Sequence, residues 1–260
     1  MKLFMLLIKK LTCIPVPVIM RGNPQDLPKA MRLLPLLGLL CGALIYLASI
    51  LLEVMPSSGA AAVMVGLNVI LGGAFLLRDL VTVADGLSID PLYPPNMAAD
   101  TIPSPEANKE EVAEKERRFN TGKAGLTWGI IWLVALYCLY LWYFRSPNIS
   151  NFAFITAPVI SRWLMSWTIY YFYAIPPAWL HRNFKRKDFV ISSVLALLFV
   201  LPFSRVSLYM AILISFFGVY IFATYRQRTV GGLDDACYGA SCAWAEILFL
   251  LAWMTFDRFL

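Results

Sequence analysis

GGAFLLRDLVTVADGLSID, residues 72–90, contains the point where an apolar run ends and acidic side chains begin. Residues 60–77 carry no charge over 18 positions, and a helix rising about 1.5 Å per residue approaches the thickness of a bilayer core over that length. Arg78 and Asp79 follow directly, and Asp85 comes within the next two helical turns. The pattern predicts a membrane helix whose end carries carboxylates. Two interpretations of these carboxylates stay open, a metal site and an ordinary polar cap.

The composition is that of an integral membrane protein. Of the 260 residues, 60% are hydrophobic and 15% are charged, and the mean hydropathy is +0.68. Soluble domains carry about 25% charged residues. The single histidine, His181, excludes HExxH and paired-histidine metal sites, and the five cysteines contain no CxxC pair. Metal or phosphate chemistry would therefore depend on Asp, Glu, Arg and Lys.

Apolar runs predict an all-α, polytopic bundle of about seven transmembrane helices, with residues 1–260 forming one membrane domain. The predicted spans are residues 33–55, 60–77, 126–144, 152–175, 189–203, 206–225 and 240–256. The span at 189–203 is the weakest, because a helix needs about 20 residues to cross a bilayer. Gly38 and Gly42 have a GxxxG spacing, which lets a second helix approach closely.

Three polar segments complete the predicted domain. Residues 1–31 combine basic side chains with an apolar run too short to span, so we expect an uncleaved segment lying in the membrane interface. Residues 78–125 form a long loop, in which NKEEVAEKERR at 108–118 predicts a short charged helix. Residues 226–239 form a loop rich in glycine and aspartate.

The distribution of basic residues predicts the orientation. With a cytoplasmic N-terminus, 18 of the 22 Lys and Arg residues fall in inside segments, 3 fall outside, and Arg162 lies within a span. Lys and Arg are usually enriched on the cytoplasmic side. This explains the net charge of +6 without nucleic acid. We expect a multi-pass protein of the plasma (inner) membrane with a cytoplasmic N-terminus, and with the 78–125 and 226–239 segments on the same face.

The 226–239 segment carries residues suited to phosphate and metal binding. Gly231 and Gly232 are adjacent, and Asp234 and Asp235 follow. Glycines admit a phosphate close to the backbone, and carboxylates can hold Mg²⁺ against a diphosphate. The same residues also suit an ordinary polar turn, and the alternative stays open.

Two charged residues lie inside predicted spans. Arg162 and Glu246 are surrounded in sequence by apolar residues. An arginine at that depth costs about 3 kcal/mol or more unless it pairs with an acid, a phosphate or a water-filled cavity. A phosphate-binding role and a buried ion pair with Glu246 or Asp85 are both compatible with the sequence.

Several segments, in order and spacing, resemble the cobalamin synthase family, adenosylcobinamide-GDP ribazoletransferase. The segments are KKLTCIPVP, RLLPLLGLLCGAL, GGAFLLRDLVTVADGL, FNTGKAGLTWGII, ISRW and RTVGGLDDACYGASCAWAEILFLL. The resemblance implies transfer of the adenosylcobinamide phosphoryl group from adenosylcobinamide-GDP to α-ribazole or its 5′-phosphate, with release of GMP, late in cobalamin biosynthesis. It implies Mg²⁺ as cofactor, and the corrinoid, the nucleoside and membrane lipid as partners.

The resemblance implies site residues as well. Of the family motif G-G-x-H-x-D-G-L-A-D-T-A-D-G-L, the last Asp-Gly matches Asp85 and Gly86, while the first Asp falls on Arg78 and the second on Thr82. The expected magnesium ligands are Asp79, Asp85, Asp234 and Asp235. The expected catalytic residues are Asp85, Asp234, Asp235 and Glu246. The expected phosphate-binding residues are Arg78, Arg162, Gly86, Gly231 and Gly232.

Because key acidic positions of the family motifs are replaced, two alternatives accompany this interpretation. One is a family member without catalysis that binds a corrinoid as an accessory membrane protein. The other is a phosphotransferase that acts on a different nucleotide-diphosphate substrate, with Arg78 and Arg162 binding phosphate.

Overall fold

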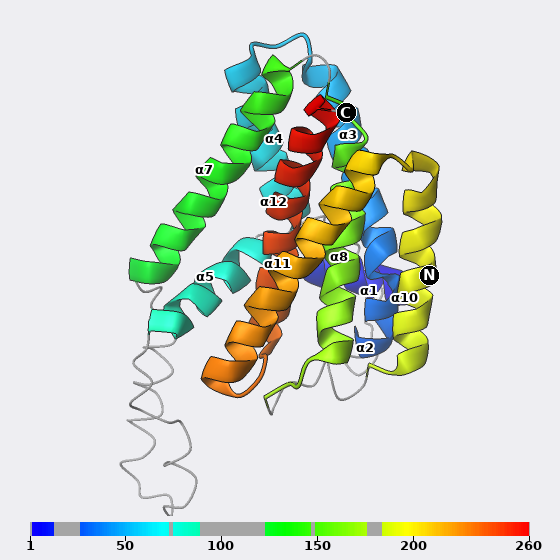
Figure 1. Cartoon of the computed structure of the whole chain (residues 1–260), viewed down its shortest axis with the longest axis vertical. Helices are drawn as coiled ribbons and strands as arrows, with labels where there is room; N and C mark the ends of the chain where they lie inside the picture. Colours follow the sequence, from blue (N-terminus) through cyan, green and yellow to red (C-terminus); the bar gives the residue numbers. More distant parts are fainter. Residues whose placement is uncertain are drawn as a thin grey trace, which may run out of the picture.

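The computed structural model describes residues 2–12, 27–72, 75–88, 123–146, 149–175 and 184–259. Within these ranges the chain is helical and forms no strand, apart from one isolated backbone bridge between Ala174 and Leu233 (Figure 1). The prediction of an all-α membrane bundle is confirmed. The predicted charged helix at 108–118 lies outside the described residues.

The described helices follow one another in chain order. They are α1 (Lys2–Leu11), α2 (Leu27–Ala30), α3 (Leu34–Leu52), α4 (Ser57–Leu71), α5 (Phe75–Ser88), α7 (Lys123–Arg145), α8 (Ala153–Tyr171), α10 (Arg186–Val200), α11 (Val206–Val230) and α12 (Asp235–Phe259), with 3₁₀ turns at Met31–Leu33 and Leu201–Phe203. Most of the long helices run along the length of the bundle (Figure 1).

The predicted count of seven spans is not confirmed. In the part of the chain that the structure describes, four segments are long and apolar enough to cross a membrane: Met31–Leu52, Ala124–Arg145, Val206–Val230 and Asp235–Arg258. A fifth is reached if α4 and α5 are counted as one bent span. The predicted fifth span corresponds to α10, which has 15 residues and is too short to cross by itself.

The span predicted over 60–77 is divided between two helices. α4 ends at Leu71 and α5 begins at Phe75, and the two helix axes differ by 83° (Figure 1). The apolar character of a segment predicts that it avoids water, but it does not predict where the helix axis changes direction. As a result residues 78–88, predicted as the start of a polar loop, belong to α5.

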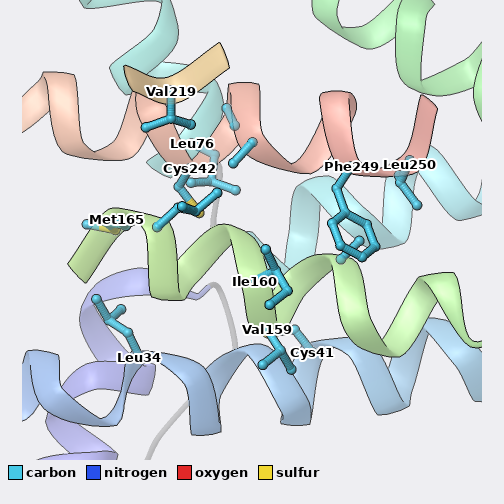
Figure 2. Packing of buried hydrophobic residues seen from close by; sticks show 14 of the residues in the cluster. Leu34, Cys41, Leu76, Val159, Ile160, Met165, Val219, Cys242, Phe249 and Leu250 are labelled. Atoms are coloured by element: carbon cyan, nitrogen blue, oxygen red, sulfur yellow. The ribbon is translucent and has the colours of Figure 1, made fainter. Parts of the chain in front are cut away.

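α8 is the central helix of the bundle. It lies between α3 and α12 (Figure 2). Of its 19 residues, 15 are buried. Gly38 and Gly42 of α3 face its backbone: a Cβ on Gly42 would lie 2.7 Å from the Ile155 carbonyl oxygen, and one on Gly38 would lie 2.8 Å from the Pro158 carbonyl carbon. The GxxxG spacing therefore serves the close approach that the sequence predicts.

The predicted loop over 226–239 is reduced to residues 231–234. α11 ends at Val230, and Gly231, which caps it, has a left-handed φ of 87°. Leu233 then pairs with the segment that follows α8: its N–H donates to the Tyr173 carbonyl at 2.9 Å, and its carbonyl accepts from Ile175 N at 3.0 Å. Asp234 caps the next helix by accepting from Cys237 N at 2.8 Å. These contacts hold the start of α12 beside the end of α8.

Candidate functional site

The Asp79 carboxylate lies against the first turns of α12. Asp79 is 3% exposed, and a Cβ on Gly239 of α12 would lie 2.8 Å from its Cγ, so only glycine leaves room for the acid. Arg78 donates to Oδ1 from Nη2 at 3.3 Å and from Nε at 3.4 Å. Oδ2 is buried and has no hydrogen-bond partner among the described residues.

Asp234 and Asp235 come close to Asp79 although they lie 155 and 156 residues away in sequence. The three carboxylates are within electrostatic reach of one another, and both residues of the pair repel a charge on Asp79. Asp235 Oδ1 is buried and also lacks a partner among the described residues. Asp234 is more accessible, with 49% of its side chain exposed. The structure thus joins acids from the two segments that the sequence places on one membrane face.

Asp85 is directed elsewhere. It lies six residues after Asp79 on α5, which is about 9 Å along the axis and about 120° around it. Gly125 N at the start of α7 donates to Asp85 Oδ1 at 2.6 Å. Asp85 therefore connects α5 to α7, and Gly86 lies beside it in the last turn of α5.

The predicted four-carboxylate metal shell is not assembled. In the described ranges no group of three or more His, Cys, Asp or Glu side chains is placed to hold a metal ion. The reason is helical periodicity, because a helix that directs Asp79 to α12 directs Asp85 to α7. Magnesium usually takes one or two protein carboxylates and completes its shell with phosphate oxygens and water. Asp79 Oδ2 and Asp235 Oδ1 fit that smaller donor set, because both oxygens are buried and neither has a hydrogen-bond partner in the part of the chain that the structure describes.

Glu246 lies deeper in the bundle than Asp234 and Asp235, the other predicted catalytic residues near α12. It is 11 residues beyond Asp235 on α12, about 16 Å along the axis. Its Oε1 accepts from Asn68 Nδ2 at 2.7 Å, and the same amide lies 2.8 Å from the Tyr140 hydroxyl. Glu246 is predicted to lie with the acids of the site, and in the structure it belongs to a polar network among α4, α7 and α12.

Arg162 is also inside the bundle, on α8. Its Nη1 donates to the Pro158 carbonyl at 3.1 Å, and it lies within electrostatic reach of Glu246 without an ion pair at 4 Å or less. Of the two acids considered as partners from the sequence, the structure favours Glu246 over Asp85. Arg162 also lines a narrow pocket with Leu76 and Cys242.

Gly231 and Gly232 have structural reasons to be glycine. Gly231 ends α11 in a left-handed conformation that side chains rarely adopt. A Cβ on Gly232 would lie 2.9 Å from the Tyr173 carbonyl oxygen. Both glycines shape the loop that presents Asp234 and Asp235.

Arg226 was missed by the sequence analysis. It is 4% exposed on the last turns of α11, and its Nη2 lies 3.9 Å from Asp234 Oδ2. Its only sequence signal is a basic residue shortly before the glycine pair, which also suits a residue at the membrane surface. The structure shows that α11 continues past the predicted end at residue 225 and carries Arg226 to the acids.

These features define a class of protein: a polytopic helical membrane protein in which carboxylates and arginines from distant segments gather beside one inter-helix loop. Sequence comparison identifies which family this is. The sequence model described as cobalamin-5-phosphate synthase matches residues 3–92 and 99–254. The chain belongs to this family.

Three curated relatives are each named adenosylcobinamide-GDP ribazoletransferase. The protein of Desulfitobacterium hafniense is 27% identical over 253 residues, covering 93% of this chain and 92% of the relative. The protein of Alkaliphilus oremlandii is 28% identical over 261 residues, covering 97% and 96%. That of Caldanaerobacter subterraneus is 25% identical over 262 residues, covering 95% and 96%. No solved structure matches the chain.

Proposed function

We propose that this chain transfers the adenosylcobinamide phosphoryl group from adenosylcobinamide-GDP to α-ribazole or its 5′-phosphate and releases GMP. The observation that carries the proposal is that Asp79, paired with Arg78, lies within electrostatic reach of Asp234 and Asp235, and that Arg226 lies 3.9 Å from Asp234. Membership of the cobalamin-5-phosphate synthase family and the names of the three relatives support the same reaction. The two alternatives drawn from the sequence, an accessory protein and a different phosphotransferase, are not favoured by these comparisons.

Phosphoryl transfer requires positioning and charge neutralisation more than covalent work by the protein. Asp79 and Asp235 would hold Mg²⁺, which neutralises charge on the diphosphate and on the departing GMP when it is bound. Arg78, whose side chain is 73% exposed, can reach a phosphate from the solvent side while it stays paired with Asp79. Asp234 is the accessible acid, and we assign to it the acceptance of the proton from the attacking ribose hydroxyl.

The other predicted residues have supporting roles in this proposal. Asp85 fixes α5 onto α7, and Glu246 with Arg162 forms part of the polar interior that positions α8 and α12. Gly231 and Gly232 set the path of the loop beneath the diphosphate. None of these residues needs to touch the reacting phosphorus for the site to work.

We also propose a location in the plasma (inner) membrane, with the N-terminus, α5 and the 231–234 loop toward the cytoplasm. The basic residues concentrated in the corresponding segments support this orientation. Such a placement lets soluble nucleotide substrates reach the acids, while the apolar bundle keeps the corrinoid at the membrane surface. Residues 1–260 act as one membrane domain in this proposal.

GMP release tests the function. Full-length protein in detergent, given adenosylcobinamide-GDP, α-ribazole and Mg²⁺, is expected to produce GMP and a cobalamin product. Asp79→Asn is expected to lower turnover by roughly 100-fold or more, because it removes a buried charge from the site. Glu53→Gln, a matched change at an exposed acid, should leave turnover unchanged, because Glu53 belongs to the turn that follows α3, at the opposite end of the bundle (Figure 1). Binding of the corrinoid without any GMP release by the wild type would contradict the proposal.

A further inference from the structure

Arg226 is a buried cation, and two of its guanidinium nitrogens have no hydrogen-bond partner among the described residues. A guanidinium carries five N–H donors and stays charged in proteins, so a buried one normally has several acceptors. Here Nε and Nη1 are buried without a partner among the described residues. Nη2 lies 3.9 Å from Asp234 Oδ2, which is a charge contact beyond hydrogen-bond length.

The groups around Arg226 indicate which kind of hydrogen-bond acceptor would complete its environment. It stands beside Asp234, which in turn is electrostatically coupled to Asp79 and Asp235. Arg226 also lies within electrostatic reach of Cys237, in the first turn of α12, where backbone N–H groups carry partial positive charge. An anion placed among these groups would satisfy the guanidinium and share the cation that the carboxylates would hold.

A purely structural role for Arg226 is less consistent with the geometry. A cation near the C-terminal end of α11 is favourable for the helix dipole, and it also stabilises Asp234. An exposed arginine would meet both effects, and Arg205 shows that pairing with an aspartate needs no burial: it lies 3.6 Å from Asp257 with half of its side chain in solvent. Burial of the Arg226 guanidinium with unpaired N–H groups is explained if another ligand binds to them.

We propose that Arg226 binds a phosphate group of the diphosphate substrate directly, through the N–H groups that the protein leaves unpaired. The ligand class is a diphosphate ester, and its identity as a nucleoside diphosphate rests on the proposed function. A planar guanidinium matches the oxygens of a phosphate better than an ammonium does, so lysine would be a poor replacement. Arg226 and Arg78 would then contact the diphosphate from two helices.

Inorganic pyrophosphate binding to the full-length protein in detergent tests this assignment, with and without Mg²⁺, by calorimetry. Wild type is expected to bind pyrophosphate, and Arg226→Lys and Arg226→Gln are expected to bind it roughly tenfold more weakly or worse. The control is Arg205→Lys, a change in the matched Arg–Asp pair at the opposite end of the bundle. It is expected to bind pyrophosphate like wild type. Melting temperatures without ligand identify which variants are folded. Equal pyrophosphate affinity in a folded Arg226 variant, or no binding by wild type, overturns the assignment.

A second measurement covers the case in which neither Arg226 variant folds. Phenylglyoxal modifies guanidinium groups, and pyrophosphate is expected to slow modification of Arg226 in the wild type without slowing that of Arg205, as read by mass spectrometry. Equal rates at Arg226 with and without pyrophosphate refute the assignment. Pyrophosphate binding through Arg226 without GMP release would refute the proposed function alone, whereas GMP release with unchanged KM in Arg226→Lys would refute this inference alone.

Discussion

Glycine at position 239 is what allows the Asp79 carboxylate to lie against α12. A Cβ on residue 239 would overlap the Asp79 carboxylate. The direction of the Asp79 side chain matters for the site, so this overlap would disturb it. Gly125 on α7 has the same role for Asp85 of α5, because a Cβ on Gly125 would overlap the Asp85 carboxylate. At the scale of single residues, the site therefore depends on two glycines that contact acids as much as on the acids themselves.

Gly239→Ala is expected to lower GMP release by at least roughly tenfold while it changes thermal stability little, because alanine displaces the Asp79 carboxylate but favours the helix. Turnover and melting temperature of the same preparation check both parts. Gly66→Ala, on a face of α4 with open space around the Cβ position, is the control and should keep full turnover. Full activity in Gly239→Ala would show that the position of Asp79 does not matter.

At the scale of secondary-structure elements, α8 is fixed in place by small residues and polar contacts. α3 approaches its backbone at Gly38 and Gly42, and α10 approaches through a hydrogen bond between Ser192 and Ser166 at 3.0 Å. Between helices in lipid there is little hydrophobic driving force, so close packing and hydrogen bonds stabilise the contact. The end of α8 then holds the 231–234 loop, so its packing also sets the place of Asp234.

Gly38→Ala is expected to destabilise the bundle by about 1–3 kcal/mol, because the added Cβ meets the Pro158 backbone and α3 and α8 must separate. The melting temperature in detergent should fall accordingly, and turnover should fall with it at elevated temperature. Gly66→Ala again provides the control, with unchanged or slightly higher stability. A melting temperature equal to wild type in Gly38→Ala would contradict the packing described for α3 and α8.

At the scale of the whole molecule, the two ends of the bundle differ in chemistry. The 231–234 loop with its acids lies at one end, and the turn that follows α3 lies at the other (Figure 1). At that second end Asp257 accepts hydrogen bonds from Ser150 N at 2.7 Å and from the Ser207 hydroxyl at 3.3 Å. These contacts tie the ends of α11 and α12 together away from the proposed chemistry.

Accessibility labelling tests the proposed orientation in intact spheroplasts. In a variant whose native cysteines are replaced by serine, Glu53→Cys is expected to react with a membrane-impermeant thiol reagent added outside. Gln227→Cys, also at an exposed position, is expected to react only after the membrane is permeabilised. The reverse pattern would place the acids on the outer face and remove the positive-inside argument.

The sequence by itself determined the membrane class, the helical fold and most helix positions, because the transfer of an apolar run out of water is a local property of that run. It also determined that acids from two distant segments could meet, since the order of spans and the distribution of charges place both segments on one membrane face. Tertiary structure decided which acids meet: the 83° change of axis between α4 and α5 and the periodicity of α5 send Asp79 to α12 and Asp85 to α7. It alone placed Arg226 beside Asp234, because burial and pairing of a side chain depend on neighbouring helices and not on its own segment.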